Sequence, residues 1–108
     1  DIGDVLAPHS HGEMVGAILR PYVRVELRWV VAHHGVFQIH HYGALTGDDP
    51  DARDRFAGHP HFDACAEFCD LYDQNCFDPD YDWLDVDTFA PMVRRVFAEP
   101  RYLEPGAA

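Results

Sequence analysis

Residues 10–35, SHGEMVGAILRPYVRVELRWVVAHHG, decide the fold of this 108-residue chain. Ser10 and Glu13 have the S-x-x-E spacing of a capping box, in which each side chain satisfies a free backbone N–H at a helix start. Apolar residues then recur at helical spacing. The stretch therefore predicts a first helix over about residues 11–20.

A second helix is expected to begin at Pro21, which suits the first turn of a helix, and to end at His34 with Gly35 as its stop signal. β-branched residues leave a strand as the competing interpretation, but the run is long and lacks strict alternation. Two antiparallel helices joined at Pro21 would bring His11, at the start of one, near His34, at the end of the other.

The remaining sequence predicts two more helices separated by loops. Residues 35–50 are aromatic, rich in histidine and then rich in turn residues, so they predict a loop or a broken helix. Pro60 opens the helical run HPHFDACAEFCDLYDQ (59–74), and an acidic loop follows it. Asp87 is expected to cap a last helix, TFAPMVRRVFA (88–98). The fold class is all-α, with one domain over residues 1–98 and a C-terminal tail over 99–108.

Composition excludes several partners. The chain has 19 acidic residues against 8 basic ones, all arginine, and a net charge of -11, which repels nucleic acids and anionic membranes. It has neither a long apolar run nor a signal peptide at its N-terminus, so we expect a cytoplasmic protein. Its three cysteines suit reduced thiols better than a disulfide framework.

The eight histidines are the anomaly in the composition. His11 and His34 are candidates for shared metal ligation between two helices, against the simpler interpretation that both are exposed residues at helix ends. Asp70 and Asp73 lie three apart on a predicted helix and would share one side of it. Asp73 has aromatic neighbours and needs a partner, whereas Asp70 is better explained as a solvated surface residue.

Other candidate sites have simpler explanations. Cys65 and Cys69 face the same way as Phe62, which is typical of core cysteines, and their spacing does not suit zinc. The acidic loop over residues 78–89 begins like a calcium loop but lacks the required glycine and final glutamate. Neither a nucleophile elbow nor a phosphate-binding glycine motif occurs.

Four segments resemble, in order, the HD-domain metal-dependent phosphohydrolase superfamily. DIGD (1–4) resembles the Asp of the His-Asp doublet followed by I-G. HGEMVGAILRPYV (11–23) and WVVAHHGVFQ (29–38) are similar to the two histidine-bearing helices. HPHFDACAEFCDLYDQ (59–74) is similar to the helix with the final Asp. The resemblance implies an HD-domain-like helical bundle.

The resemblance also implies a dinuclear metal site. Asp1 would bridge the two metals, His11 and His34 would bind the second, and Asp73 would complete the first, with His33 as the alternative to His34. The cofactor would be a divalent transition metal, two per intact site, with Fe as first choice and Mn, Co, Ni or Zn as alternatives. Two further residues near these ligands, Glu13 and Gln38, are candidates for substrate contact, and His40 and His41 are expected at the pocket rim or surface.

The lead into the last Asp most resembles the branch with inositol oxygenase and the phosphonate-cleaving di-iron oxygenases. Where the phosphonate enzymes carry lysines, this chain has Gln38 and Phe77, which argues against a phosphonate. Hydrolysis is the commoner activity in the superfamily, so the resemblance implies a phosphohydrolase with a small-molecule substrate, although the motif details favour the alternative, a mixed-valence di-iron oxygenase acting on a small polar substrate.

The family's first histidine helix and the His of the doublet have no counterpart in this sequence. We therefore expect a fragment that lacks the N-terminal helices of the bundle and is inactive by itself, with self-association through the surface those helices would cover. A non-catalytic, helical metal-binding module is the second alternative to a phosphohydrolase.

Overall fold

The structure is a computed structural model that describes residues 5–102, and within this range all regular structure is helical. This confirms the predicted all-α class. The α-helices are α2 (His11–Leu19), α3 (Val25–Thr46), α4 (Phe62–Phe68) and α5 (Ala90–Phe97). Shorter turns are η1 (Ala52–Phe56), η2 (Cys69–Asp73), η3 (Gln74–Phe77) and η4 (Val86–Thr88).

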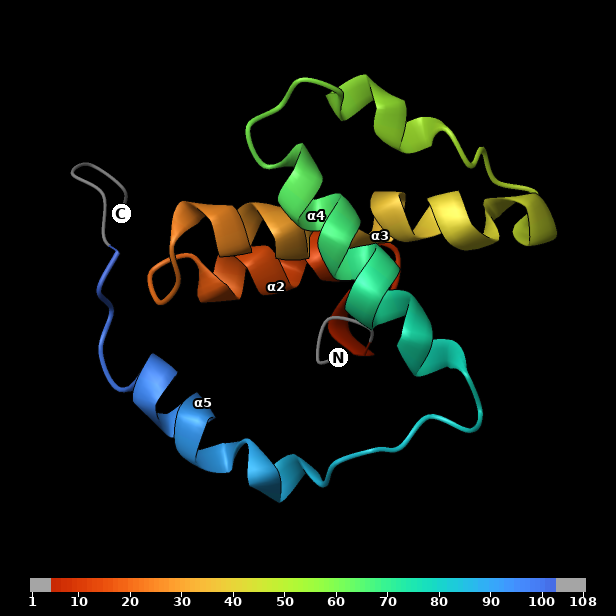
Figure 1. The fold of residues 1–108 in the computed structure, drawn as a ribbon. Coiled ribbons are helices and arrows are strands. Elements are labelled where there is room, and N and C mark those ends of the chain that lie inside the picture. The colour runs from red at the N-terminus through yellow and green to blue at the C-terminus, as the bar shows by residue number, and fades with distance from the viewer. Residues whose placement is uncertain (1–4, 103–108) are drawn as a thin grey trace.

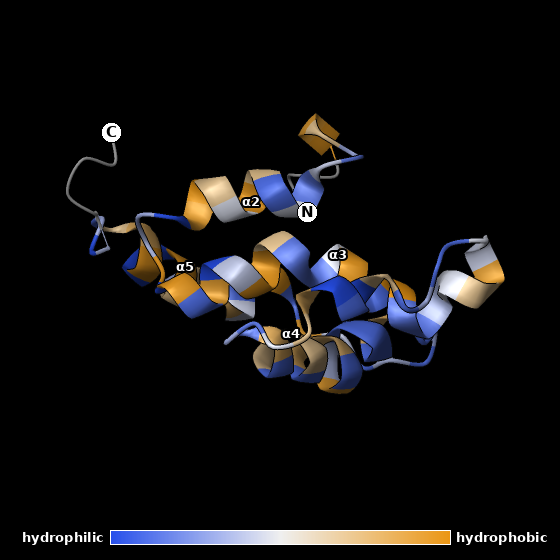
Figure 2. Ribbon diagram, turned by 90° about the horizontal axis from the view of Figure 1, so that it is seen from above, coloured by the Kyte–Doolittle hydropathy of each residue, from blue (hydrophilic) through white to orange (hydrophobic). Residues whose placement is uncertain are grey.

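The long helix α3 is the centre of the fold. Helix α2 packs along one side of it, and α4 with η2 packs on another side, as the two views of the chain show (Figures 1 and 2). The buried apolar residues come from α3, α4 and η2, and are Val30, Phe37, Cys65 and Cys69. The prediction that Cys65 and Cys69 are core residues is therefore confirmed.

The predicted bounds of the second helix were wrong at both ends. Helix α3 begins at Val25 rather than Pro21, and it runs through Gly35 to Thr46, where a loop or a broken helix was expected. A glycine inside a helix costs about 1 kcal/mol relative to alanine, which is less than the packing on both sides of α3 can supply. The actual stop is Gly47, whose φ of 85° lies in the left-handed region that favours glycine.

Of the two predicted helix caps, Ser10 was partly right and Asp87 was wrong. Ser10 is the N-cap residue of α2, but its side chain makes no capping hydrogen bond. Asp87 does not cap the last helix: it lies in η4, where its amide donates to the Asp85 carboxylate, and the N-cap of α5 is Phe89. Because the Asp85 carboxylate accepts from the Asp87 amide, it closes the separate turn η4, which ends before α5 begins.

The predicted helix over residues 59–74 changes its winding partway. It begins as α4, widens at Cys69–Asp73 into the π-helical turn η2, and tightens into the 3-10 turn η3. Short π-helical turns are frequent at functional sites. Because a π turn holds more residues than an α turn, the side chains after Cys69 point in directions that α-helical spacing does not predict.

Helix α5 touches the rest of the fold near its C-terminal end. The rings of Phe97 and Tyr22 lie 4.8 Å apart, and the amides of Arg101 and Tyr102 donate to the carbonyl oxygen of Pro21. In Figure 1 the body of α5 stands away from the other labelled helices. None of the helices within residues 5–102 combines the length and apolar character needed to cross a bilayer.

Two glycines let α2 lie very close to α3. A Cβ at Gly12 would lie 2.9 Å from the carbonyl oxygen of Val31 and 3.0 Å from that of Ala32, distances that real side chains avoid. One turn later, a Cβ at Gly16 would lie 3.2 Å from the Cβ of Ala32. The helices therefore approach through backbone rather than through interdigitating side chains, and any side chain at position 12 must push them apart.

We predict that Gly12→Ala lowers the free energy of unfolding by about 1–3 kcal/mol, the usual cost of forcing atoms into a filled contact. Urea unfolding followed by circular dichroism measures this directly. The matched control is Gly35→Ala in α3, where an added Cβ meets nothing within 4 Å. It should raise stability by about 0.5–1 kcal/mol, because alanine is the better helix former. Equal effects of the two changes would contradict the close approach at Gly12.

Candidate metal centre

His11 and His34 meet between α2 and α3. Their Nε2 atoms lie 3.0 Å apart, and the two rings are nearly perpendicular, with centroids 4.9 Å apart. His11 is the first residue of α2, as expected, whereas His34 lies inside α3 and not at its end. The two residues still meet because α2 runs antiparallel along α3 and reaches His34 at its own N-terminus.

The hydrogen bonds of His34 orient its ring. Its Nδ1 lies 2.5 Å from the carbonyl oxygen of Val31, which accepts only, so Nδ1 carries the hydrogen and the Nε2 lone pair faces His11. Metal-binding histidines commonly donate their second ring N–H to a backbone carbonyl in this way. The chain thus presents an oriented nitrogen lone pair at the point where the two rings meet.

A pocket of about 680 Å³ opens beside the histidine pair. His11, His34, Gln38 and Asp73 all line it, so three of the four predicted metal-binding residues border one space. The fourth, Asp1, lies outside the described residues. Within residues 5–102, no group of three His, Cys, Asp or Glu side chains comes close enough together to hold a metal ion by itself. Among the described candidate ligands, the two imidazoles are therefore the pair in direct contact, and Asp73 borders the same pocket.

Asp70 and Asp73 do not share one side of their helix. Asp73 borders the pocket of the histidine pair, whereas Asp70 is exposed and borders a separate pocket with His40 and His41. The π-helical turn η2 contains both residues and changes the angle between their side chains relative to an α-helix. The interpretation of Asp70 as a surface residue agrees with its exposure.

Glu13 and His33 lie away from the pocket of the histidine pair. Both line a different groove between α2 and α3, so Glu13 does not border the same space as Gln38. His33 follows Trp29 by one turn, stacks on its indole with ring centroids 4.0 Å apart, and donates from Nδ1 to the Trp29 carbonyl oxygen. It therefore faces a different neighbour from His34, although the two are adjacent in sequence.

Gln38 borders the pocket and carries unpaired polar atoms. Both its Oε1 and its Nε2 are buried without a hydrogen-bond partner. A buried amide without partners is costly, and such a group usually finds a water or a ligand. Gln38 therefore has an unused donor and an unused acceptor next to the pocket.

Sequence reasoning missed the pocket residues that follow Gln38 along α3. Tyr42 and Thr46 continue the stripe begun by His34 and Gln38 at intervals of four residues, and all four border the pocket. That regular spacing was visible in the sequence but was hidden by the expectation that Gly35 ends the helix. Trp83 borders the pocket from the far loop, and no local pattern predicts that long-range contact.

Comparisons with known proteins add no relative. No protein-family model matches the chain. No curated protein and no solved structure matches it either.

A buried thiol supports the backbone behind His34. The Cys69 thiol contacts the carbonyl oxygen of His34 at 3.4 Å and is fully buried. A hydrogen bond with Cys65, and then burial, raise the pKa of the Cys69 thiol far above its ordinary value. Cys69 therefore stays protonated and inert at neutral pH, because the thiolate is the reactive form.

We predict that only one of the three thiols reacts with a disulfide reagent in the folded protein. Cys76 is partly exposed, whereas Cys65 and Cys69 are fully buried. Labelling followed by mass spectrometry should show one modified cysteine when native and three in urea. Raising the pH to about 8.5 should leave Cys69 unlabelled, because burial and its raised pKa both withhold the thiolate. A second rapidly labelled cysteine in the folded state would contradict this packing.

Proposed function

We propose that His11 and His34 bind a divalent transition metal ion as part of an HD-superfamily metal centre. The supporting observation is the Nε2 to Nε2 distance of 3.0 Å. Two nitrogens bound to one ion at about 2.1 Å lie ~3.0 Å apart at a ligand angle of 90° and ~3.4 Å apart at a tetrahedral angle. The distance between the two nitrogens therefore matches that of two imidazoles sharing one ion.

The surrounding residues also fit a metal. The Nδ1–H of His34 is held by the Val31 carbonyl oxygen, which keeps the Nε2 lone pair directed toward His11. Asp73 borders the same pocket and is the proposed carboxylate ligand there, with Asp1 as the bridging one. Imidazole and carboxylate ligands bind several divalent transition metals, and we propose iron as the first choice, with Mn, Co, Ni or Zn as alternatives.

We propose phosphoester hydrolysis as the reaction of this centre. A bound divalent metal supplies Lewis-acid activation and neutralises charge on a phosphoryl group. Gln38, with an unpaired donor and an unpaired acceptor at the pocket, would orient a small polar substrate. The pocket provides space for a small molecule beside the histidine pair.

One observation favours the di-iron oxygenase as a second candidate. The described residues that line the pocket include the carboxylates of Asp48 and Asp73 but neither arginine nor lysine. A phosphate group would therefore rely on metal ions alone for its charge, whereas an uncharged polar substrate would not. This charge distribution suits oxidation of a hydroxylated molecule better than hydrolysis of an anionic one.

We predict that the protein binds Mn²⁺ or Fe²⁺ and that His11→Ala and His34→Ala each lower the affinity at least ~10-fold, because each removes one of two oriented ligands. Anaerobic titration calorimetry and elemental analysis measure affinity and stoichiometry. His40→Ala is the matched control, since its Nδ1 faces the Pro50 carbonyl oxygen at an exposed position away from the pair. Unchanged metal content in both His11 and His34 variants would refute the site.

We also predict that metal affinity falls as the pH is lowered from about 7.5 to about 5.5. A proton and a metal ion compete for the same imidazole lone pair, so the neutral form is the one that binds. Titrations at a series of pH values test this, and circular dichroism at each pH separates loss of ligation from unfolding. An affinity independent of pH would mean that imidazoles are not the ligands.

The reaction is tested on the protein expressed anaerobically and loaded with each metal in turn. Hydrolysis of p-nitrophenyl phosphate with Mn²⁺, lost in His34→Ala, supports the phosphohydrolase. A mixed-valence di-iron signal in electron paramagnetic resonance, with consumption of O2, supports the oxygenase instead. Metal binding with neither activity would leave the helical metal-binding module as the function.

A further inference from the structure

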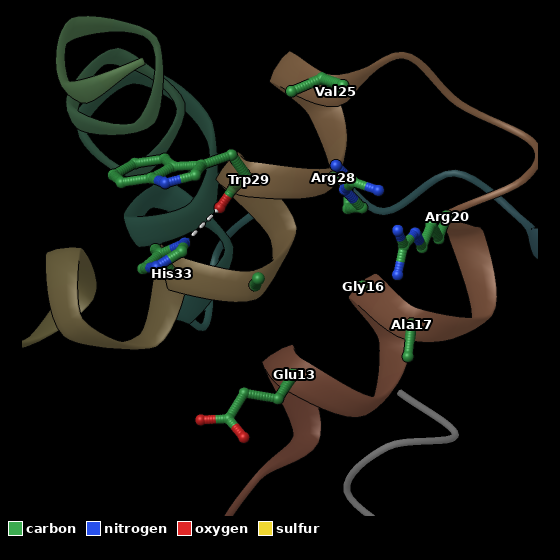
Figure 3. A pocket seen from close by; sticks show the side chains of 9 residues that line it. Glu13, Gly16, Ala17, Arg20, Val25, Arg28, Trp29 and His33 are labelled. Atoms are coloured by element: carbon green, nitrogen blue, oxygen red, sulfur yellow. Dashed lines mark hydrogen bonds between the residues drawn. The ribbon is translucent and has the colours of Figure 1, made fainter. Parts of the chain in front are cut away.

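We propose that the groove between α2 and α3, separate from the histidine pocket, binds a small organic carboxylate. The groove has a volume of about 440 Å³. Figure 3 shows Arg20 and Arg28 near one end of it, Glu13 near the other end, and Gly16 and Ala17 between them. This proposal does not depend on the metal site, because His11 and His34 do not line the groove.

The positive end of the groove is formed by two helices. Arg20 follows the last residue of α2, and Arg28 is the fourth residue of α3. Two guanidinium groups at one place are unusual in a chain of net charge -11 with only 8 basic residues. Arginine presents paired N–H donors that match a carboxylate in geometry as well as charge. Both arginines also take part in other interactions, so a ligand must compete for them and its affinity will be modest.

The floor of the groove is apolar and is formed by small residues. Gly16, Ala17 and Ala32 line it, and the small side chains at these positions follow from the close approach of the helices at Gly16. Such a floor leaves room for the body of a small molecule and offers it contact with apolar surface. A ligand of fitting shape therefore combines an anionic group with an apolar or aromatic body.

Trp29 and His33 border the groove from α3. His33 and His59 each stack on the Trp29 indole, with ring centroids 4.0 Å and 4.3 Å away and planes within 18° of parallel. These two stacked imidazoles hold the orientation of the indole, which makes Trp29 a suitable reporter for a ligand bound in the groove.

The opposite end of the groove selects a single negative charge. Glu13 and Arg20 lie two helical turns apart on α2, roughly 10 Å along the axis. The Glu13 carboxylate repels a second anionic group, and the negative field of the whole chain disfavours a dianion more than a monoanion. A monocarboxylate fits these charges better than a phosphate ester.

The test is a fluorescence titration of the metal-free Trp83→Phe protein, in which Trp29 is the remaining tryptophan. Benzoate should change the emission saturably with a dissociation constant near ~1 mM, and its uncharged analogue benzamide should not. Arg28→Gln and Arg20→Gln should each weaken benzoate binding at least ~5-fold, because each removes a charged donor pair. Glu13→Gln should strengthen it, because a repelling carboxylate is lost.

Arg94→Gln is the matched control, since it makes the same change of charge on α5, away from the groove. Circular dichroism confirms that each variant is folded. Equal binding of benzamide, absence of saturation up to about 50 mM at constant ionic strength, or equal weakening by Arg94→Gln would overturn the proposal. Tighter binding of phenyl phosphate than of benzoate would overturn the choice of a carboxylate.

Discussion

The contact on which both sites depend is the one between the backbones of α2 and α3 at Gly12. The absence of a side chain there lets α2 come within contact distance of the Val31 and Ala32 carbonyl groups. His11 is the residue beside this contact, and His34 is a short step further along α3, so the closeness of the backbones is what allows their rings to meet at 3.0 Å. The same approach, continued at Gly16, leaves the low floor of the groove on the other side. A single pair of glycines thus determines the geometry of two candidate binding sites.

Helix α3 separates these sites because of its own periodicity. Successive side chains of an α-helix differ by about 100° in direction, so residues that are adjacent in sequence contact different parts of the fold. His33 stacks on Trp29 at the groove, whereas His34 meets His11 at the pocket. The run of histidines that looks like one cluster in the sequence is divided by the helix into residues with different surroundings. A helix that ended at Gly35 could not also carry Gln38, Tyr42 and Thr46 along the pocket.

The sequence predicted the all-α class, the core cysteines and the meeting of His11 with His34, because each rests on periodicity or on the direction of adjacent helices. It did not predict the length of α3, because a glycine is a stop signal only when packing does not outweigh its cost, and the segments that pack against α3 lie far from Gly35 in the sequence. The different directions of Asp70 and Asp73 were also missed, since a π-helical turn has no reliable local signature. The separation of Glu13 from Gln38 depends on the angle between helices, which spacing alone does not give.

The distance between the two imidazoles limits what the pair can hold. With the Nδ1–H of His34 bound to the Val31 carbonyl oxygen, its Nε2 has a lone pair and no hydrogen, so the contact of 3.0 Å requires something electrophilic from the side of His11. If the His11 Nε2 carries a proton, it donates a hydrogen bond to the His34 Nε2. A proton on both Nε2 atoms would place two N–H groups against each other, and no proton at all would leave two lone pairs facing. The space therefore suits one electrophile, either a proton or a metal ion. The metal site that we propose corresponds to the second of these two cases, in which the ion replaces the proton between the imidazoles.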